Sequence, residues 1–119
     1  MEQNPAILIV GLHCRPDQEE KFNKWYNERH IPDLLEFKGV RKVTRYKTLT
    51  HFKTRDGYPD VRYPSYLAIY EFENQQTLEA FEASSQLVDA AKEARETWAE
   101  DSYERMWWLR SEALKTWES

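Results

Sequence analysis

Apolar and polar positions along the chain predict four strands. Residues 5–13 contain a continuous apolar run at residues 7–10, which is typical of a strand covered on both faces. Residues 40–52 are rich in Val, Thr and Tyr, as expected for a second, long strand. Residues 65–72 and 103–110 are expected to form the third and fourth strands. In both segments, apolar or aromatic side chains occur at odd and at even positions, so they face both sides of the sheet. The second and third strands follow each other directly, so we expect them to pair as an antiparallel hairpin.

The segment after the first strand predicts a helix. Asp17 followed by Glu20 fits a capping box, and the helix is expected to run to residue 29 or 30. Pro32 is expected to end it, because proline lacks the amide hydrogen that a helix uses. Residues 31–37 then form a short extra turn, which Gly39 closes with a positive φ.

A second helical pattern begins after residue 73. Asn74 is a good N-cap residue, and Leu78 and Phe81 lie on the expected inner side of the helix. A pair of serines at residues 84–85 can interrupt this helix before helical spacing continues to Trp98.

The resulting order, β-α-β-β-α-β, predicts an α+β, ferredoxin-like fold in one domain spanning residues 1–119. Its four-stranded antiparallel sheet has both helices on one face. The other face would also be apolar, because Leu67 and Ile69 alternate with tyrosines and because Trp107 and Trp108 point to opposite sides. We therefore expect a homodimer with the two sheets packed face to face.

Composition narrows the class of protein. The chain has 119 residues, of which 40% are hydrophobic and 14% aromatic, so a disordered chain is excluded. The net charge is −4, and without a basic tract we expect no nucleic-acid partner. The longest apolar run, residues 6–10, is too short to cross a membrane, and no secretory leader is recognised. Cys14 stands alone, which fits a reducing compartment and a cytoplasmic location.

The most promising chemistry lies in the first helix. Phe22, Tyr26 and His30 are spaced four residues apart, so they form one stripe of a helix. His30 is the candidate general acid or base, because its ordinary pKa lies near neutral pH. The alternative is that it only bonds the last carbonyls of the helix. Tyr26 either orients the imidazole and polarises a substrate oxygen or simply packs its ring, and Trp25 is expected to form a pocket wall.

The motif Phe22-x-x-Trp25-Tyr26-x-x-x-His30-x-Pro32-x-Leu34, followed by Gly39-Val40 and Arg45-Tyr46, resembles the dimeric α/β-barrel superfamily, and the EthD-like group within it. The resemblance implies a homodimer whose two sheets form a barrel. It also implies relatives that are cofactor-free isomerases, cyclases and dehydratases of lactones and polyketides, besides monooxygenases, haem-handling proteins and members without a known role. In EthD-like enzymes the histidine of His-x-Pro is a candidate acid or base, which is His30 here.

Several further residues are candidates for binding a substrate. Arg45 can hold a carboxylate, or can form an ordinary ion pair. Tyr66, Tyr70 and Trp108 are expected to line a small-molecule cavity, or else to fill a ring-rich dimer core. The connection over residues 50–64, with a turn signal at residues 56–57, is longer than a plain hairpin needs and can cover the cavity.

We expect no metal and no cofactor. His13 and His51 are each expected at a strand end, and the three histidines lack the local spacing of a metal site. Cys14 has no neighbour in sequence that would activate its thiolate.

The sequence thus favours a small cofactor-independent lyase, isomerase or cyclase that acts on a compact, mostly apolar, oxygenated metabolite. A non-catalytic ligand-binding or structural homodimer is the alternative, and a monooxygenase-like member is a further one.

Overall fold

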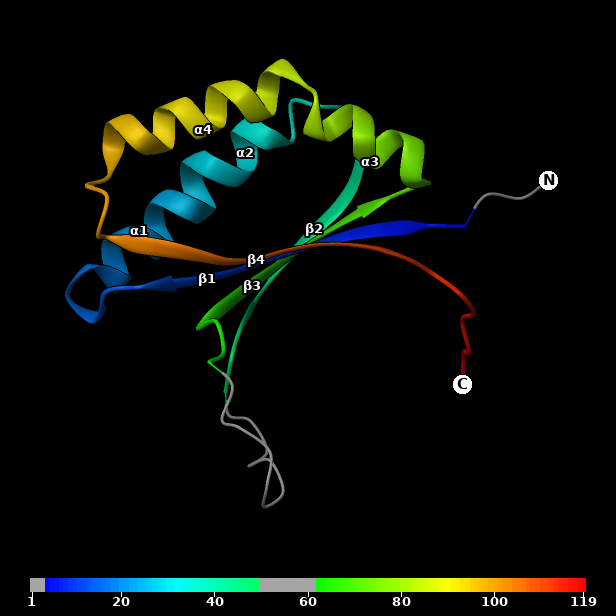
Figure 1. The fold of residues 1–119 in the computed structure, drawn as a ribbon, viewed down its shortest axis with the longest axis horizontal. Helices are drawn as coiled ribbons and strands as arrows, with labels where there is room; N and C mark the ends of the chain where they lie inside the picture. Colours follow the sequence, from blue (N-terminus) through cyan, green and yellow to red (C-terminus); the bar gives the residue numbers. More distant parts are fainter. Residues whose placement is uncertain (1–3, 50–61) are drawn as a thin grey trace.

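The structure, a computed structural model, describes residues 4–49 and 62–119. Four strands form one antiparallel sheet in the order β2-β3-β1-β4 (Figure 1). The strands are β1 (Ala6–Cys14), β2 (Val40–Lys47), β3 (Tyr66–Phe72) and β4 (Tyr103–Glu112). The helical segments are η1 (Pro16–Gln18), α1 (Glu19–Trp25), η2 (Tyr26–His30), α2 (Ile31–Leu34), α3 (Gln75–Glu82) and α4 (Ser85–Thr97).

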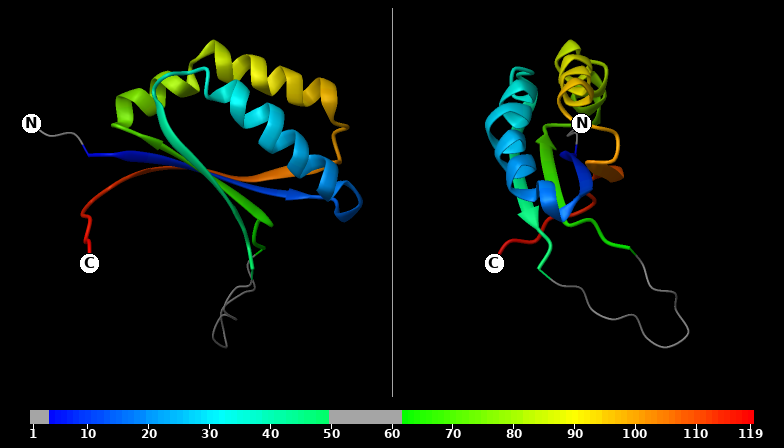
Figure 2. Two further views of the ribbon diagram at one scale, coloured as in Figure 1. Left: turned by 180° about the vertical axis from the view of Figure 1, so that it is seen from behind. Right: turned by 90° about the vertical axis from the view of Figure 1, so that its left-hand side faces the viewer.

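All helices cover the same face of the sheet, as both views in Figure 2 show. Burial follows this arrangement, since every second residue of β3, from Tyr66 to Phe72, is buried beneath the helices. The predicted ferredoxin-like α+β fold is therefore confirmed, as is the antiparallel pairing of β2 with β3.

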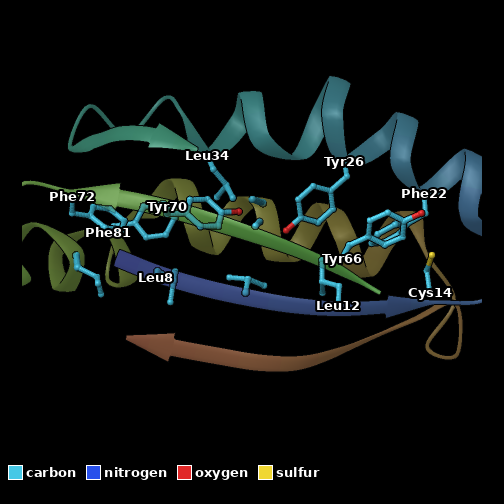
Figure 3. Close-up of a cluster of buried hydrophobic side chains, with 14 of the residues drawn as sticks. Leu8, Leu12, Cys14, Phe22, Tyr26, Leu34, Tyr66, Tyr70, Phe72 and Phe81 are labelled. Atoms are coloured by element: carbon cyan, nitrogen blue, oxygen red, sulfur yellow. The ribbon is translucent and has the colours of Figure 1, made fainter. Parts of the chain in front are cut away.

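The packed core lies between the sheet and the helices (Figure 3). Its largest fully buried side chains come from both layers: Phe22, Leu34, Leu78 and Phe81 from the helices, and Leu8, Tyr70 and Phe72 from the sheet.

The structure shows which strand side chains lie on the helix-covered face of the sheet and which lie on the other face. Trp108 lies opposite Val10, which is buried on the helix-covered face, whereas Trp107 lies opposite Gly11 on the other face. The two tryptophans therefore point to opposite sides, as predicted. On the face without helices, Leu67 and Ile69 are only half-buried.

Strand β2 is shorter than predicted, because it ends at Lys47 rather than reaching residue 52. Thr48 still donates its amide hydrogen to the carbonyl of Ser65 (2.9 Å), but the next residue on the partner strand is Pro64. Proline has no amide hydrogen to continue the ladder, so pairing stops there. His51 and the turn signal at residues 56–57 lie outside the described residues.

The predicted capping box at the start of the first helix is wrong. The carboxylate of Asp17 pairs with the guanidinium of Arg15 (2.9 Å) and caps no amide. The chain makes the 3₁₀ turn η1 first, and α1 begins only at Glu19.

The prediction that Pro32 ends the helix is also wrong. The helix runs without a break from α1 through a π turn, η2, into α2, where Pro32 occupies the first turn. In the π turn the amide of Ile31 bonds the carbonyl of Tyr26, five residues back. This wider turn places Pro32 at the start of a new α segment, where its missing amide hydrogen has little cost.

Gly39 serves a different purpose from the one predicted. Its φ is not positive, but a Cβ atom there would lie 2.5 Å from Phe37 Cε1 and 2.5 Å from Thr77 Cγ2. Glycine is needed because two side chains pack directly against the backbone.

The second helical region follows the sequence prediction. The side chain of Asn74 accepts a hydrogen bond from the amide of Thr77 (2.8 Å) and caps α3. Ser84 then caps α4 by accepting from the amide of Leu87 (3.2 Å), so the serine pair does divide the helix. Over residues 4–49 and 62–119, no helix has the length and apolar character that a membrane span requires.

Candidate functional site

A cavity of about 320 Å³ lies between the helices and the sheet. Its floor is formed by side chains of β1, β3 and β4, and its walls by η2, α2 and α4. Most of the lining is aliphatic or aromatic, and the members of the predicted site that reach it are Trp25, Tyr26, His30, Tyr70 and Trp108. This volume is at the small end of the range for ligand pockets, so a compact molecule fits it best.

The π turn positions His30 against two aromatic rings. The imidazole stacks on Trp25 with ring centroids 4.8 Å apart and an interplanar angle of 27°, and it lies 4.8 Å from the ring of Tyr26. Hydrogen bonds in a π turn join residues five apart, so Trp25 and His30 lie one turn from each other. The predicted stripe is confirmed as a run of ring contacts, because the ring of Phe22 lies 5.6 Å from that of Tyr26.

The imidazole of His30 is neutral at neutral pH. Burial lowers its pKa from 6.5 to about 4, against the opposing effect of the carboxylates of Glu93 and Asp33. Its Nδ1 atom is buried and has no hydrogen-bond partner among residues 4–49 and 62–119. The ring therefore offers a free nitrogen in a largely apolar setting.

Two phenol groups face each other beside this histidine. The hydroxyls of Tyr26 and Tyr70 point toward one another in Figure 3, and both side chains are almost fully buried. Burial raises the pKa of Tyr26, and it raises that of Tyr70 well above the ordinary value. Both phenols thus stay protonated, and a hydrogen bond joins them, which raises the pKa of Tyr70 and lowers that of Tyr26, so Tyr70 is the donor and Tyr26 the acceptor. The hydroxyl hydrogen of Tyr26 is the one that can be donated to an oxygen atom in the cavity.

Helix α4 fixes the orientation of Trp25. The indole Nε1 donates to both carboxylate oxygens of Glu93 (3.1 Å each), and the hydroxyl of Thr97 donates to one of them (2.8 Å). The ring on which His30 stacks is therefore anchored from the opposite wall.

Two predicted binding residues do not line the cavity. Arg45 lies at the edge of the sheet, donates to the side-chain oxygens of Asn27 (2.8 Å) and Asn23 (3.0 Å), and its guanidinium lies 4.4 Å from the ring centre of Tyr26. The hydroxyl of Tyr66 bonds Asn23 and the carboxylate of Glu19. Both residues instead connect the sheet, at β2 and β3, to the first helical region.

The sequence analysis did not identify several lining residues. Leu12, Arg95, Tyr103 and Arg105 all reach the cavity. They come from β1, α4 and β4, which meet only in the folded chain. The helical spacing of Ala91, Ala94 and Arg95 was the available signal, since it places α4 against the sheet.

The remaining candidates lie elsewhere. His13 is exposed and bonds Ser65 through Nδ1 (2.7 Å) on the sheet face without helices. Cys14 is buried, and burial raises the pKa of its thiol, so its reactive thiolate form is disfavoured. Within the described part of the chain, no three His, Cys, Asp or Glu side chains are grouped to hold a metal ion.

Comparisons with known proteins agree with this fold. The sequence profile of a family described as "Domain of unknown function (DUF4286)" matches residues 6–113. No curated protein matches the chain. Among solved structures, HapK from Hahella chejuensis is similar with a TM-score of 0.65 and 11% identity, covering 96% of this chain and 97% of that one.

Members of the EthD group are also similar. An EthD family protein from Bacillus halodurans has a TM-score of 0.62 and 14% identity, with 92% of this chain and 99% of that chain covered. A Bacteroides thetaiotaomicron protein of unknown function, described as a possible oxidoreductase, has a TM-score of 0.62 and 14% identity, with 93% and 99% covered. The resemblance to the EthD-like group is thereby confirmed at the level of the fold.

Proposed function

The chain belongs to the DUF4286 family, and we propose that it is a small cofactor-independent enzyme of the lyase, isomerase or cyclase type. Its substrate is a compact, mostly apolar, oxygenated molecule, and His30 is the general acid or base. One observation carries the proposal: a neutral imidazole and the hydroxyl of Tyr26, which accepts a hydrogen bond from Tyr70, reach the same small cavity, whose lining residues are mainly aliphatic or aromatic.

The arrangement suits proton transfer next to a carbonyl group. The imidazole of His30 takes a proton from the carbon beside the carbonyl, so a C–H bond breaks and an N–H bond forms. The carbonyl oxygen gains the electron pair, and a hydrogen bond from Tyr26, whose own oxygen accepts from Tyr70, stabilises it as an enolate. Return of the proton to another atom completes an isomerisation, and loss of a leaving group completes an elimination.

The test measures this proton transfer without knowledge of the natural substrate. 2-Tetralone is incubated in D₂O, and exchange of its acidic C–H protons is followed by NMR against a sample without protein. We expect exchange with the protein to fall roughly 10²- to 10⁴-fold in His30→Gln. His13→Gln is the matched control, because His13 lies on the other sheet face and should leave exchange unchanged. Full exchange in His30→Gln would refute the role.

A second function, ligand binding without turnover, is favoured by one specific observation. Catalytic histidines are commonly oriented by a third group, yet no described residue bonds Nδ1 of His30. A molecule that quenches the fluorescence of Trp25 and Trp108 but is recovered unchanged supports this alternative. Aerobic consumption of a hydroquinone would instead support the monooxygenase-like alternative.

We also propose that the protein is a homodimer built through the sheet face that carries no helices. That face holds apolar side chains from all four strands: Ile7, Ile9, Tyr46, Leu67, Ile69, Trp107 and Leu109. Tyr46 is 49% exposed and Leu109 is 47% exposed. A second copy is the occupant we favour, because a broad apolar face can pair with itself about a two-fold axis. The last residues after β4 run on the same side of the sheet (Figure 1).

Sedimentation analysis tests the dimer. Ile69→Glu places a charge at the centre of the proposed interface, so we expect a monomer with the helical content retained. Val88→Glu is the control, because Val88 is 60% exposed on α4, away from this face. A wild-type monomer at micromolar concentration, or a dimer that survives Ile69→Glu, would contradict the proposal.

A further inference from the structure

Two arginines stand at the mouth of the cavity. Arg95 comes from the last turn of α4 and Arg105 from β4, and both line the cavity while remaining exposed to solvent. Arg105 lies opposite Leu12, a buried residue of the helix-covered face, so its side chain rises on the side of the cavity. Its guanidinium carbon is 4.9 Å from the ring centre of Trp108, which holds it over an aromatic wall.

Neither arginine is paired with a carboxylate among the described residues. Four other arginines in the described part of the chain are so paired: Arg15, Arg29, Arg62 and Arg110 each lie within 4.0 Å of an Asp or Glu oxygen. Glu93 is the acidic group near the mouth, but its oxygens accept hydrogen bonds from Trp25 and Thr97. No described carboxylate therefore neutralises these two positive charges, in a protein whose net charge is negative.

Tyr103 indicates that both charges act on the same region. Its ring lines the cavity and is half-buried, and its pKa is raised by burial. The positive charges of Arg105 and Arg95 both oppose that rise, while Glu93 adds to it. Two guanidinium groups, one from α4 and one from β4, thus act on the same hydroxyl.

We propose that the cavity binds a ring-bearing carboxylic acid, with its carboxylate held by Arg95 and Arg105 and its ring enclosed by Trp25, Tyr26 and Trp108. This inference rests on the proposed function only in using the same cavity. A guanidinium fork matches a planar carboxylate and can bond it through two parallel N–H donors. The largely apolar walls and the volume of about 320 Å³ suit a single ring or a small fused body.

The experiment compares acids with uncharged amides of nearly the same shape. Benzoate, phenylacetate and cyclohexanecarboxylate are titrated against the full-length protein, each beside its primary amide, by calorimetry and ligand-observed NMR. We expect each acid to bind about tenfold more tightly than its amide at low salt, with the difference shrinking as salt is added. Arg95→Gln and Arg105→Gln should each reduce the preference several-fold, and the double variant should abolish it.

Arg41→Gln is the matched control, because it removes the same charge from an exposed position on β2 that does not line the cavity. It should leave the preference for acids unchanged. Equal binding of acids and amides, failure of every acid to bind at millimolar concentration, or a preference that persists in the double variant would each overturn the proposal. Binding of inorganic phosphate as tight as that of the acids would also overturn it.

The binding experiment and the exchange experiment can fail independently of each other. If acids bind selectively but His30→Gln exchanges protons as well as wild type, only the catalytic role of His30 is wrong. If exchange depends on His30 but acids and amides bind alike, only the present inference is wrong.

Discussion

Acid should destabilise the protein through His30 in particular. The folded chain holds the pKa of this imidazole at about 4, against 6.5 for a histidine in water. Below pH 6.5 the unfolded chain therefore binds a proton that the folded chain does not, so the free energy of unfolding falls as the pH falls. The shift of about 2.5 pH units corresponds to a total loss of about 3 kcal/mol, of which about 2 kcal/mol falls between about pH 7 and about pH 4.5.

Urea unfolding at a series of pH values measures this loss. Carboxylates also titrate at the acidic end, so the informative quantity is the difference between wild type and His30→Gln, which lacks the imidazole but keeps every carboxylate. We expect the free energy of unfolding to fall by about 2 kcal/mol more in wild type than in His30→Gln over that range. His13→Gln, at an exposed position, should follow wild type. Parallel curves for wild type and His30→Gln would show that burial does not suppress protonation of His30.

Three further substitutions test the packing. Phe22→Ala should lower the free energy of unfolding by about 3–5 kcal/mol in urea denaturation. The reason is that this fully buried ring contacts four others, those of Trp25, Tyr26, Trp98 and Tyr103. Leu114→Ala, at a position 95% exposed, should change the free energy of unfolding little. Asn74→Ala should lower the free energy of unfolding by about 1 kcal/mol through loss of the cap on α3. Gln76→Ala, at the exposed second residue of the same helix, should be nearly neutral. Gly39→Ala should cost about 1–3 kcal/mol, because the new methyl group meets Phe37 and Thr77; an unchanged thermal midpoint would mean that these two side chains move aside freely.

The fold was predictable because local signals and their order agreed. The apolar run in β1, the cap at Asn74 and the serine pair at residues 84–85 each marked an element that the structure contains. The face of each strand was not predictable, because β3 is apolar on both phases. Only the helices decide that Tyr70 is buried among the core residues while Ile69 lies on the opposite side.

The candidate site was predictable only where its members are close in sequence. Tyr26 and His30 were found because they are four residues apart. The stacking of His30 on Trp25 was not predicted, because an α-helix would place residues five apart on different faces. The π turn that brings the two rings together has no recognisable sequence signal here. Arg95 and Arg105 were missed for a different reason, since they belong to separate elements that meet only through long-range packing.

A carboxylate bound by the two arginines would change the pKa of His30. An imidazole with a pKa of about 4 is a poor base at neutral pH, since proton transfer is most efficient when the pKa lies near the working pH. A carboxylate bound between Arg95 and Arg105 would bring a negative charge to the cavity. That charge favours the protonated imidazole and raises the pKa of His30 toward neutrality. His30 would then be a stronger base with an acidic ligand than with a neutral ketone, so selectivity for acids and the rate of proton transfer would be linked without either depending on the other.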